Sequence, residues 1–131
     1  MRTEETTEIM RRFNQAFLEH DPAMFADLVG PDCVMESIQP APNGTRYEGY
    51  EACLEFWQTL AADKISYFEV EDTLAMGEHA TIRWRFNFGE GQSVRGVNVM
   101  RVRDGKIVEA LGYSKTPGDA AVPLAADPSG R

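Results

Sequence analysis

Features that commonly reveal a function are scarce in this sequence, which has two cysteines, two histidines and no long apolar run. Cys33 and Cys53 stand far apart and form no metal-binding or redox motif, so we interpret both as buried free thiols and expect a cytoplasmic protein. No stretch approaches the roughly 20 apolar residues of a membrane-spanning helix, so we expect no membrane partner. The acidic N-terminal segment lacks the apolar core of a signal peptide.

Basic residues are also few. Lys and Arg total 13 against 21 Asp and Glu, which gives a formal net charge of −8. Nucleic-acid binding needs clustered positive charge to displace counterions from phosphates, so this balance argues against a nucleic-acid partner. The sequence offers no His/Asp/Glu cluster, no glycine-rich phosphate loop and no serine that can be paired with a histidine. We therefore expect neither a metal nor a cofactor.

The 131 residues, 43% hydrophobic and 26% charged, have the length and composition of one globular domain. We assign this domain to residues 1–115. Residues 116–131 form a tail rich in Pro and Ala that has no periodicity, and we interpret it as a surface-lying or mobile arm.

Within the domain, the hydrophobic pattern predicts an α+β fold. Apolar residues recur at helical spacing up to His20, Asp21-Pro22 is a second helix-start signal, and an apolar stripe after Gly49 indicates a third helix. Strands are predicted over residues 32–38 and 64–75. The order of elements indicates helices segregated onto one face of an antiparallel sheet.

The stretch from residue 79 to residue 115 predicts three further strands, because apolar and aromatic residues alternate around two turn signals. Glu90-Gly91 marks the first hairpin turn and Asp104-Gly105 the second. If the first loop has two residues, Arg83 lies opposite Asn98.

Four stretches carry a resemblance to a known family. They are PDCVMES (31–37), RYEGYEAC (46–53), GEHATIRW (77–84) and VRGVNVMRVRDGKIVEALGYSK (94–115). With the two N-terminal helices, they resemble SnoaL-like members of the nuclear transport factor 2-like superfamily, which includes ketosteroid isomerases, polyketide cyclases and limonene epoxide hydrolases. The resemblance implies a cone-shaped half-barrel of antiparallel or mixed strands, covered on its concave face by three helices. It identifies a fold that hosts several functions.

The two faces of the predicted sheet differ in character. The family resemblance places Arg83, Arg85 and Asn98 inside the cone, because the position like Asn98 carries a pocket acid in ketosteroid isomerases. Composition alone favours the opposite choice, since the other face is more apolar, and a slip of one residue would exchange the faces of a strand. If the resemblance holds, the outer face needs a cover, and we expect a homodimer. That interface would consist of Trp84, Phe86, Val97, Val99 and Leu111.

The acid and base residues of the known enzymes are incomplete here. By resemblance, Ser37 stands where ketosteroid isomerases carry their aspartate base, and Phe13 stands where they carry a tyrosine. Gly112 stands where polyketide cyclases and epoxide hydrolases carry an acid. The chain is therefore not expected to be a ketosteroid isomerase, and an epoxide hydrolase is nearly as improbable.

The candidate catalytic residues that remain are Glu36, Arg83 and Asn98. Glu36 could act as a general base, while Arg83 or Asn98 would stabilise an enolate-like oxygen. Glu36 could equally be solvated, or could neutralise an internal arginine. The candidate ligand-binding residues are Phe13, Phe17, Ser37, Trp57, Arg85 and Met100; Trp57 could also be plain core.

Three functions fit these observations. The first is binding of a small, mostly apolar molecule that bears a carbonyl, enol or carboxylate group. The second is a cofactor-independent cyclase, isomerase or dehydratase that uses Glu36 as its acid or base. The third is a non-catalytic dimerisation module whose cone is filled by its own side chains. An enclosed pocket of a few hundred Å³ would favour the first two.

Overall fold

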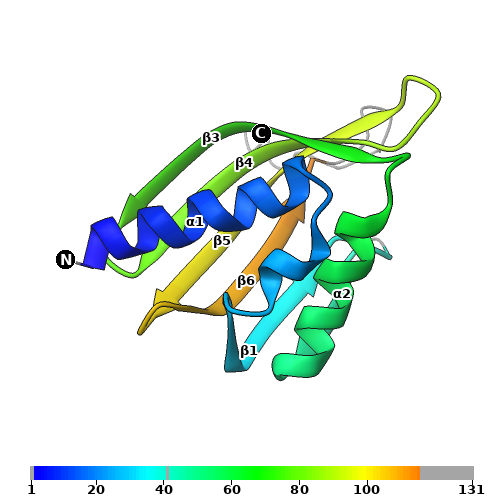
Figure 1. Ribbon diagram of the computed structural model, residues 1–131. Coiled ribbons are helices and arrows are strands. Elements are labelled where there is room, and N and C mark those ends of the chain that lie inside the picture. Colours follow the sequence, from blue (N-terminus) through cyan, green and yellow to red (C-terminus); the bar gives the residue numbers. More distant parts are fainter. Residues whose placement is uncertain (1, 41, 116–131) are drawn as a thin grey trace, which may run out of the picture.

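A computed structural model describes residues 2–40 and 42–115 of the chain, so the predicted tail lies outside the described residues. Figure 1 shows two layers, with the helices on one side of a curved sheet. The helices are α1, Arg2–Leu18; the 3-10 helix η1, Pro22–Phe25; and α2, Tyr50–Ala62. The strands are β1, Val29–Ser37; β2, Thr45–Glu48; β3, Tyr67–Met76; β4, His79–Asn87; β5, Ser93–Arg103; and β6, Lys106–Ser114.

The three predicted helices are present, but the cover is smaller than expected. Two of them are α-helices, whereas the middle one is a single 3-10 turn of four residues. Its predicted cap is confirmed, because the Asp21 carboxylate accepts a hydrogen bond of 3.2 Å from the backbone N–H of Ala23. Gly49 precedes α2 with φ +97°, a conformation that favours glycine.

The sheet is mixed. Its strand order within the described residues is β2-β1-β6-β5-β4-β3, and every neighbouring pair is antiparallel except β1 and β6, which are parallel. Strand β2 was not predicted, because it is only four residues long and directly follows a Pro- and Gly-rich loop. We call the face covered by the helices the inner face and the opposite one the outer face.

The loop between β4 and β5 contradicts the predicted register. Three residues, Gly89, Glu90 and Gly91, separate Phe88 from Gln92, and all three have positive φ values, of 104°, 55° and 74°. A three-residue loop shifts the pairing by one position relative to a two-residue loop. As a result Ile82, not Arg83, lies opposite Asn98.

The loop between β5 and β6 is the two-residue turn Asp104-Gly105, with φ values of 54° and 73°. A register shift follows between Arg101 and Val102, so that Asn98 faces Gly112, whereas a regular pairing after a three-residue loop over residues 103–105 would place Ala110 opposite it. Because the change is of two positions, Ala110 and Gly112 stay on the face that carries Asn98, and Ile107, opposite Val102, is also fully buried on that face.

The two registers decide which side chains meet the helices. Ile82 and Trp84 are buried on the inner face, with 2% and 6% of their surface exposed, whereas Arg83 between them is exposed on the outer face. Trp84 and Phe86 therefore cannot belong to an outer-face interface, and that prediction is wrong for these two residues. Val97, Val99 and Leu111 do lie on the outer face.

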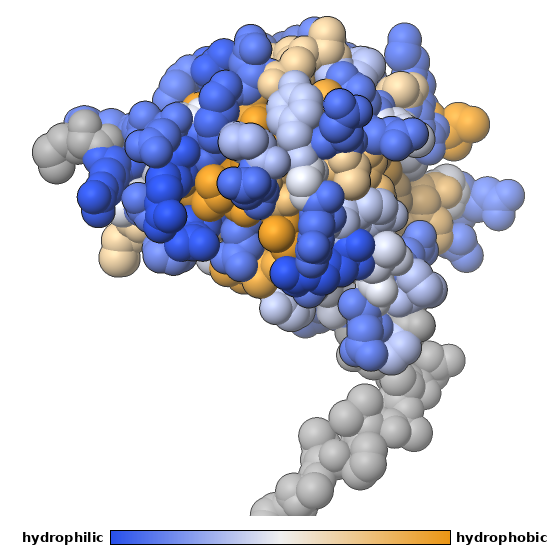
Figure 2. Space-filling model, turned by 90° about the horizontal axis from the view of Figure 1, so that it is seen from below, coloured by the Kyte–Doolittle hydropathy of each residue, from blue (hydrophilic) through white to orange (hydrophobic). Residues whose placement is uncertain are grey.

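Charged side chains dominate much of the surface. Figure 2 shows one side of the molecule, on which hydrophilic residues prevail and hydrophobic ones appear in patches between them. Among the described residues, none of the helices has the length and apolar character needed to cross a membrane.

Candidate ligand pocket

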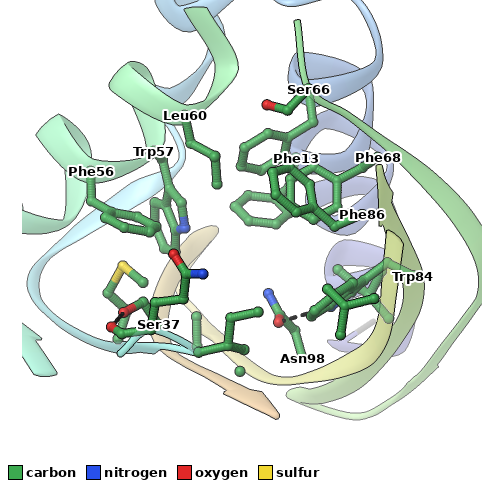
Figure 3. A pocket seen from close by; sticks show the side chains of 18 of the residues that line it. Phe13, Ser37, Phe56, Trp57, Leu60, Ser66, Phe68, Trp84, Phe86 and Asn98 are labelled. Carbon is green, nitrogen blue, oxygen red and sulfur yellow. Dashed lines mark hydrogen bonds between the residues drawn. The ribbon is translucent and has the colours of Figure 1, made fainter. Parts of the chain in front are cut away.

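A cavity of about 590 Å³ lies between the inner face of the sheet and helices α1 and α2 (Figure 3). Its volume falls in the range of small-molecule sites. The side chains of the described residues therefore leave part of the cone open. Most of the wall is apolar, and its aromatic members are Phe13, Phe17, Tyr47, Phe56, Trp57, Phe68, Trp84, Phe86 and Phe88.

The aromatic wall is held by ring-to-ring contacts between the two layers. Phe13 on α1 packs edge-to-face against Trp57 on α2, with ring centroids 5.1 Å apart. Phe68 on β3 contacts both Trp84 and Phe86 on β4, at centroid distances of 5.6 and 4.6 Å. Such contacts fix the orientation of the rings, so the wall of the cavity is preformed.

The floor of the cavity is formed by two cross-strand pairs, in each of which a glycine makes room for a larger residue. Trp84 lies opposite Gly96, and Asn98 lies opposite Gly112. A Cβ atom on Gly96 would lie 2.5 Å from the Trp84 ring, and one on Gly112 would lie 3.3 Å from Asn98 Oδ1. The two glycines therefore allow the indole and the amide to lie close to the sheet.

Trp84 and Asn98 are joined by a hydrogen bond. The indole Nε1–H donates to Asn98 Oδ1 over 3.0 Å (Figure 3). An indole N–H can only donate, so the oxygen of the amide must face it. The amide NH2 group of Asn98 then points into the cavity.

Polar groups nearer the rim have partners of their own. Ser37 Oγ donates to the Gln39 carbonyl and accepts from the Thr45 N–H. Ser66, which is buried, donates to the carboxylate of Asp63. The pKa of Asp63 is lowered, because the Ile65 N–H and, to a smaller extent, the Ser66 hydroxyl donate hydrogen bonds to its ionised form.

Six of the predicted site residues border the cavity: Phe13, Phe17, Glu36, Ser37, Trp57 and Asn98. Glu36 nevertheless sits between the inward Met35 and Ser37, and its carboxylate contacts Arg46 of β2 at 3.3 Å. This pairing directs the carboxylate away from the cavity. Met100 is fully buried in the core and is not part of the cavity wall.

Arg83 and Arg85 are not brought into the site. Both lie on the outer face, where Arg85 approaches Glu69 at 3.8 Å. In the same region Arg95 forms a two-point ion pair with Glu71, at 2.8 and 3.0 Å, and this hydrogen bonding lowers the pKa of the Glu71 carboxyl. The positive floor expected for the pocket is therefore absent.

Sequence reasoning missed the inward residues of β3 and β4, namely Phe68, Val70, Ile82, Trp84 and Phe86. Two signals could have found them. Gly89 and Gly91 flank Glu90 and allow a loop of three left-handed residues, and the apolar character of Ile82, Trp84 and Phe86 favours burial. Composition was the better guide for this strand.

The thiols lie beside the site, in the core. Cys33 and Cys53 are free and buried, and Cys53 Sγ donates to the Cys33 carbonyl over 3.4 Å. Burial raises the pKa of both thiols, and the neighbouring Cys53 raises that of Cys33 further. Within the described part of the chain, no group of three or more His, Cys, Asp or Glu residues is arranged to hold a metal.

Comparison with known proteins identifies the family. The profile of the SnoaL-like domain matches residues 10–110. The crystal structure of an NTF2-like protein of unknown function from Mesorhizobium loti has 50% sequence identity and a TM-score of 0.85, with 88% of this chain and 95% of that chain covered. A search of curated proteins gave no match.

More distant structures share the fold alone. An NTF2-like protein of unknown function from Burkholderia xenovorans is 22% identical with a TM-score of 0.73, over 95% of this chain and 94% of that chain. A LEH-like epoxide hydrolase from M. tuberculosis is 19% identical with a TM-score of 0.69, over 86% of this chain and 80% of that one. The profile match and the structure with 50% identity confirm the predicted resemblance to SnoaL-like proteins.

Proposed function

Because this chain belongs to the SnoaL-like domain family, we propose that it binds a small, mostly apolar molecule in the cavity between the helices and the sheet. The observation that carries the proposal is the preformed cavity of about 590 Å³ with its aromatic wall. An apolar cavity of this size gains free energy when a hydrophobic ligand displaces its water. A dimerisation module would have no need of it.

We assign no catalytic role to Glu36. Its carboxylate is held by Arg46, and the arginines expected to assist it lie on the outer face. Asp63 also borders the cavity, at the C-terminal end of α2. The hydrogen bonds that it accepts favour its ionised form. Binding therefore explains the site better than acid–base catalysis.

A fluorescent titration tests the proposal. Prodan is an uncharged naphthyl ketone whose emission moves to shorter wavelength in apolar surroundings, and we expect it to bind with one site per chain. Leu60→Trp places a large side chain in the cavity and should weaken binding about tenfold or more, equal to about 1.4 kcal/mol. The matched control is Thr59→Trp, because Thr59 is the neighbouring residue on α2 and is exposed.

The outcomes separate clearly. Weaker binding in Leu60→Trp alone supports the cavity as the site, and equal weakening in both variants would contradict it. Native mass spectrometry of the purified protein complements the titration, because a retained apolar ligand would be seen as a constant added mass that Leu60→Trp lacks.

We further propose that the chain forms a homodimer through the outer face. Supporting this, Val97, Val99, Leu111 and Tyr113 share that face, and 37% of Val99 and 53% of Tyr113 is exposed. A second copy would bury this apolar strip. Val99→Asp should then give a monomer in sedimentation-velocity measurements, whereas a wild-type protein that sediments as a monomer would overturn the proposal.

A further inference from the structure

Two side chains bring to the cavity N–H groups that have no acceptor in the described part of the chain. Asn98 presents its NH2 group because Trp84 holds the amide oxygen. Trp57 is 2% exposed and lines the cavity, and its indole N–H has no acceptor among the described residues. Figure 3 shows the nitrogen atoms of both side chains facing the space between α2 and the sheet. Two N–H donors therefore enter an otherwise aromatic site.

Three of the side chains in the cavity wall that carry acceptor oxygens already have partners. Ser37 Oγ accepts from Thr45, the Asp63 carboxylate accepts from Ser66, and Glu36 is paired with Arg46. Gln39, at the rim, is exposed to solvent. A ligand that reaches the floor thus meets donors that need an acceptor.

The charge of the site limits the ligand further. The described residues that line the cavity include no Lys, Arg or His, while Glu36 and Asp63 border it and the whole chain has a net charge of −8. An anionic ligand would lose its hydration without gaining a cationic partner. The two donors could attract a carboxylate, but they would not compensate for the hydration that it loses in an aromatic cavity. An anionic ligand should therefore bind poorly.

From these observations we propose that the cavity selects an uncharged molecule that carries a hydrogen-bond acceptor, such as a ketone or an ester oxygen, and that the Asn98 amide and the Trp57 indole bind it. The proposal rests on the proposed binding function and narrows it to one ligand class. Trp84 is a positioning residue, because its hydrogen bond fixes which end of the Asn98 amide faces the ligand. Gly96, which lies opposite it, leaves room for its ring.

Three naphthalene derivatives of similar size test the selection. Acetylnaphthalene is an uncharged ketone, ethylnaphthalene lacks the acceptor, and naphthoate carries a charge. Hydrocarbon binding leaves buried donors unpaired, so acetylnaphthalene should bind about tenfold more tightly than ethylnaphthalene. It should also bind at least about tenfold more tightly than naphthoate, for the desolvation reason given above.

Three variants assign the selection to its residues. Trp57→Phe keeps an aromatic ring but removes the donor, and Asn98→Leu combined with Trp84→Phe removes the other donor without leaving the Trp84 indole N–H unpaired. Each should lower the affinity ratio of acetylnaphthalene to ethylnaphthalene by about threefold to tenfold. Trp84→Phe should also lower it, because the Asn98 amide is then free to turn its oxygen toward the cavity. The ratio is the readout, since a general loss of stability weakens both ligands alike.

The possible failures are distinguishable. Equal affinities for acetylnaphthalene and ethylnaphthalene, or tighter binding of naphthoate, would overturn this inference and leave the proposed function standing. An unchanged ratio in both Trp57→Phe and the double variant Asn98→Leu with Trp84→Phe would do the same. If none of the three compounds binds and prodan does not bind either, the proposed function falls, and this inference falls with it.

Discussion

The two faces of one sheet have opposite chemistry in this protein. On the inner face, Ile82, Trp84 and Phe86 of β4 meet the helices and the cavity, while on the outer face Arg83 and Arg85 of the same strand meet solvent and acidic neighbours. Alternation along the strand produces both faces from one short stretch of sequence. The difference teaches that the register of β4 decides which of its side chains reach the cavity, and that this register depends on a single loop.

The largest effect should come from a change that puts a charge on the inner face. Trp84→Asp places a carboxylate among aromatic rings without a cationic partner, removes the hydrogen bond to Asn98 and leaves a void. We expect a loss of about 3–5 kcal/mol in the free energy of unfolding, measured by urea denaturation.

The matched control for that experiment is its neighbour on the outer face. Arg83→Met removes a solvated charge and should change the free energy of unfolding by no more than about 0.5 kcal/mol. It should leave prodan binding unchanged as well. A large loss in Arg83→Met and a small one in Trp84→Asp would reverse the assignment of the two faces.

A smaller effect should follow from adding one methyl group to the floor. In Gly96→Ala the new Cβ meets the Tyr113 carbonyl and lies 2.5 Å from the Trp84 ring, so backbone or indole must move. We expect a loss of about 1–3 kcal/mol, again measured by urea denaturation.

Gly112→Ala provides the comparison on the adjacent strand. Its new Cβ would lie 3.1 Å from the Glu36 carbonyl and 3.3 Å from Asn98 Oδ1, contacts that a shift of a few tenths of an ångström relieves. The loss should therefore be the smaller of the two, about 1 kcal/mol or less. Equal losses at both positions would contradict the arrangement of Trp84 over Gly96.

The buried thiols predict a modest dependence of stability on alkaline pH. Burial raises the pKa of Cys33 in the folded state above its value in the unfolded chain. The contribution of the neutral Cys33 thiol to the free energy of unfolding is fully present below the unfolded pKa of about 8.5. It is lost as the pH rises toward the folded pKa, because the thiol then ionises in the unfolded chain but not in the folded one. Cys33→Ala should flatten the decline in stability between about pH 8.5 and pH 10.

A chemical check accompanies the pH measurement. A thiol reagent at about pH 8 should label neither cysteine of the folded protein and both in denaturant, because the thiolate is the reactive form. Rapid labelling of the native protein would show that Cys33 or Cys53 is accessible.

The smallest effect should come from the outer face at acid pH. The ion pair with Arg95 lowers the pKa of Glu71. The contribution of this ion pair to stability is therefore present above the pKa of an unfolded glutamate and is lost as the pH falls through the folded value. Glu71→Gln should make the decline in melting temperature below about pH 5 slightly shallower. Glu55→Gln on α2 serves as the control. An equal change in both variants would show that the ion pair does not cause the pH dependence.

Much of the fold was predictable because its signals are local. Periodic apolar residues predicted α1 and α2, the Asp21-Pro22 signal predicted η1, and the Asp104-Gly105 turn predicted the last hairpin. The different pairing in that hairpin left Asn98, Ala110 and Gly112 on one face, because the shift at Arg101 changed the pairing beyond it by two positions.

The site was less predictable because it depends on pairing between strands. One extra residue in the loop at Gly89 exchanged the faces of β4 and moved Arg83 out of the expected pocket. Asn98 was placed correctly on β5, but its partner is Trp84, which had been assigned to the opposite face. Glycines on both sides of Glu90 permit a loop of two or of three residues, so the choice between the two registers rested on the apolar character of Ile82, Trp84 and Phe86.

The central claim is that two N–H donors face the cavity without an acceptor among the described residues, the Trp57 indole N–H and the Asn98 amide NH2 group, whereas the Trp84 indole N–H is already held by Asn98 Oδ1. Both tryptophans of the chain lie at this site, so the indole region of an amide correlation NMR spectrum tests it directly. The Trp57 proton should move downfield when acetylnaphthalene binds, relative to its position with ethylnaphthalene, whereas the Trp84 proton should have the same position with both. A Trp57 signal that is identical in the two complexes would contradict the account.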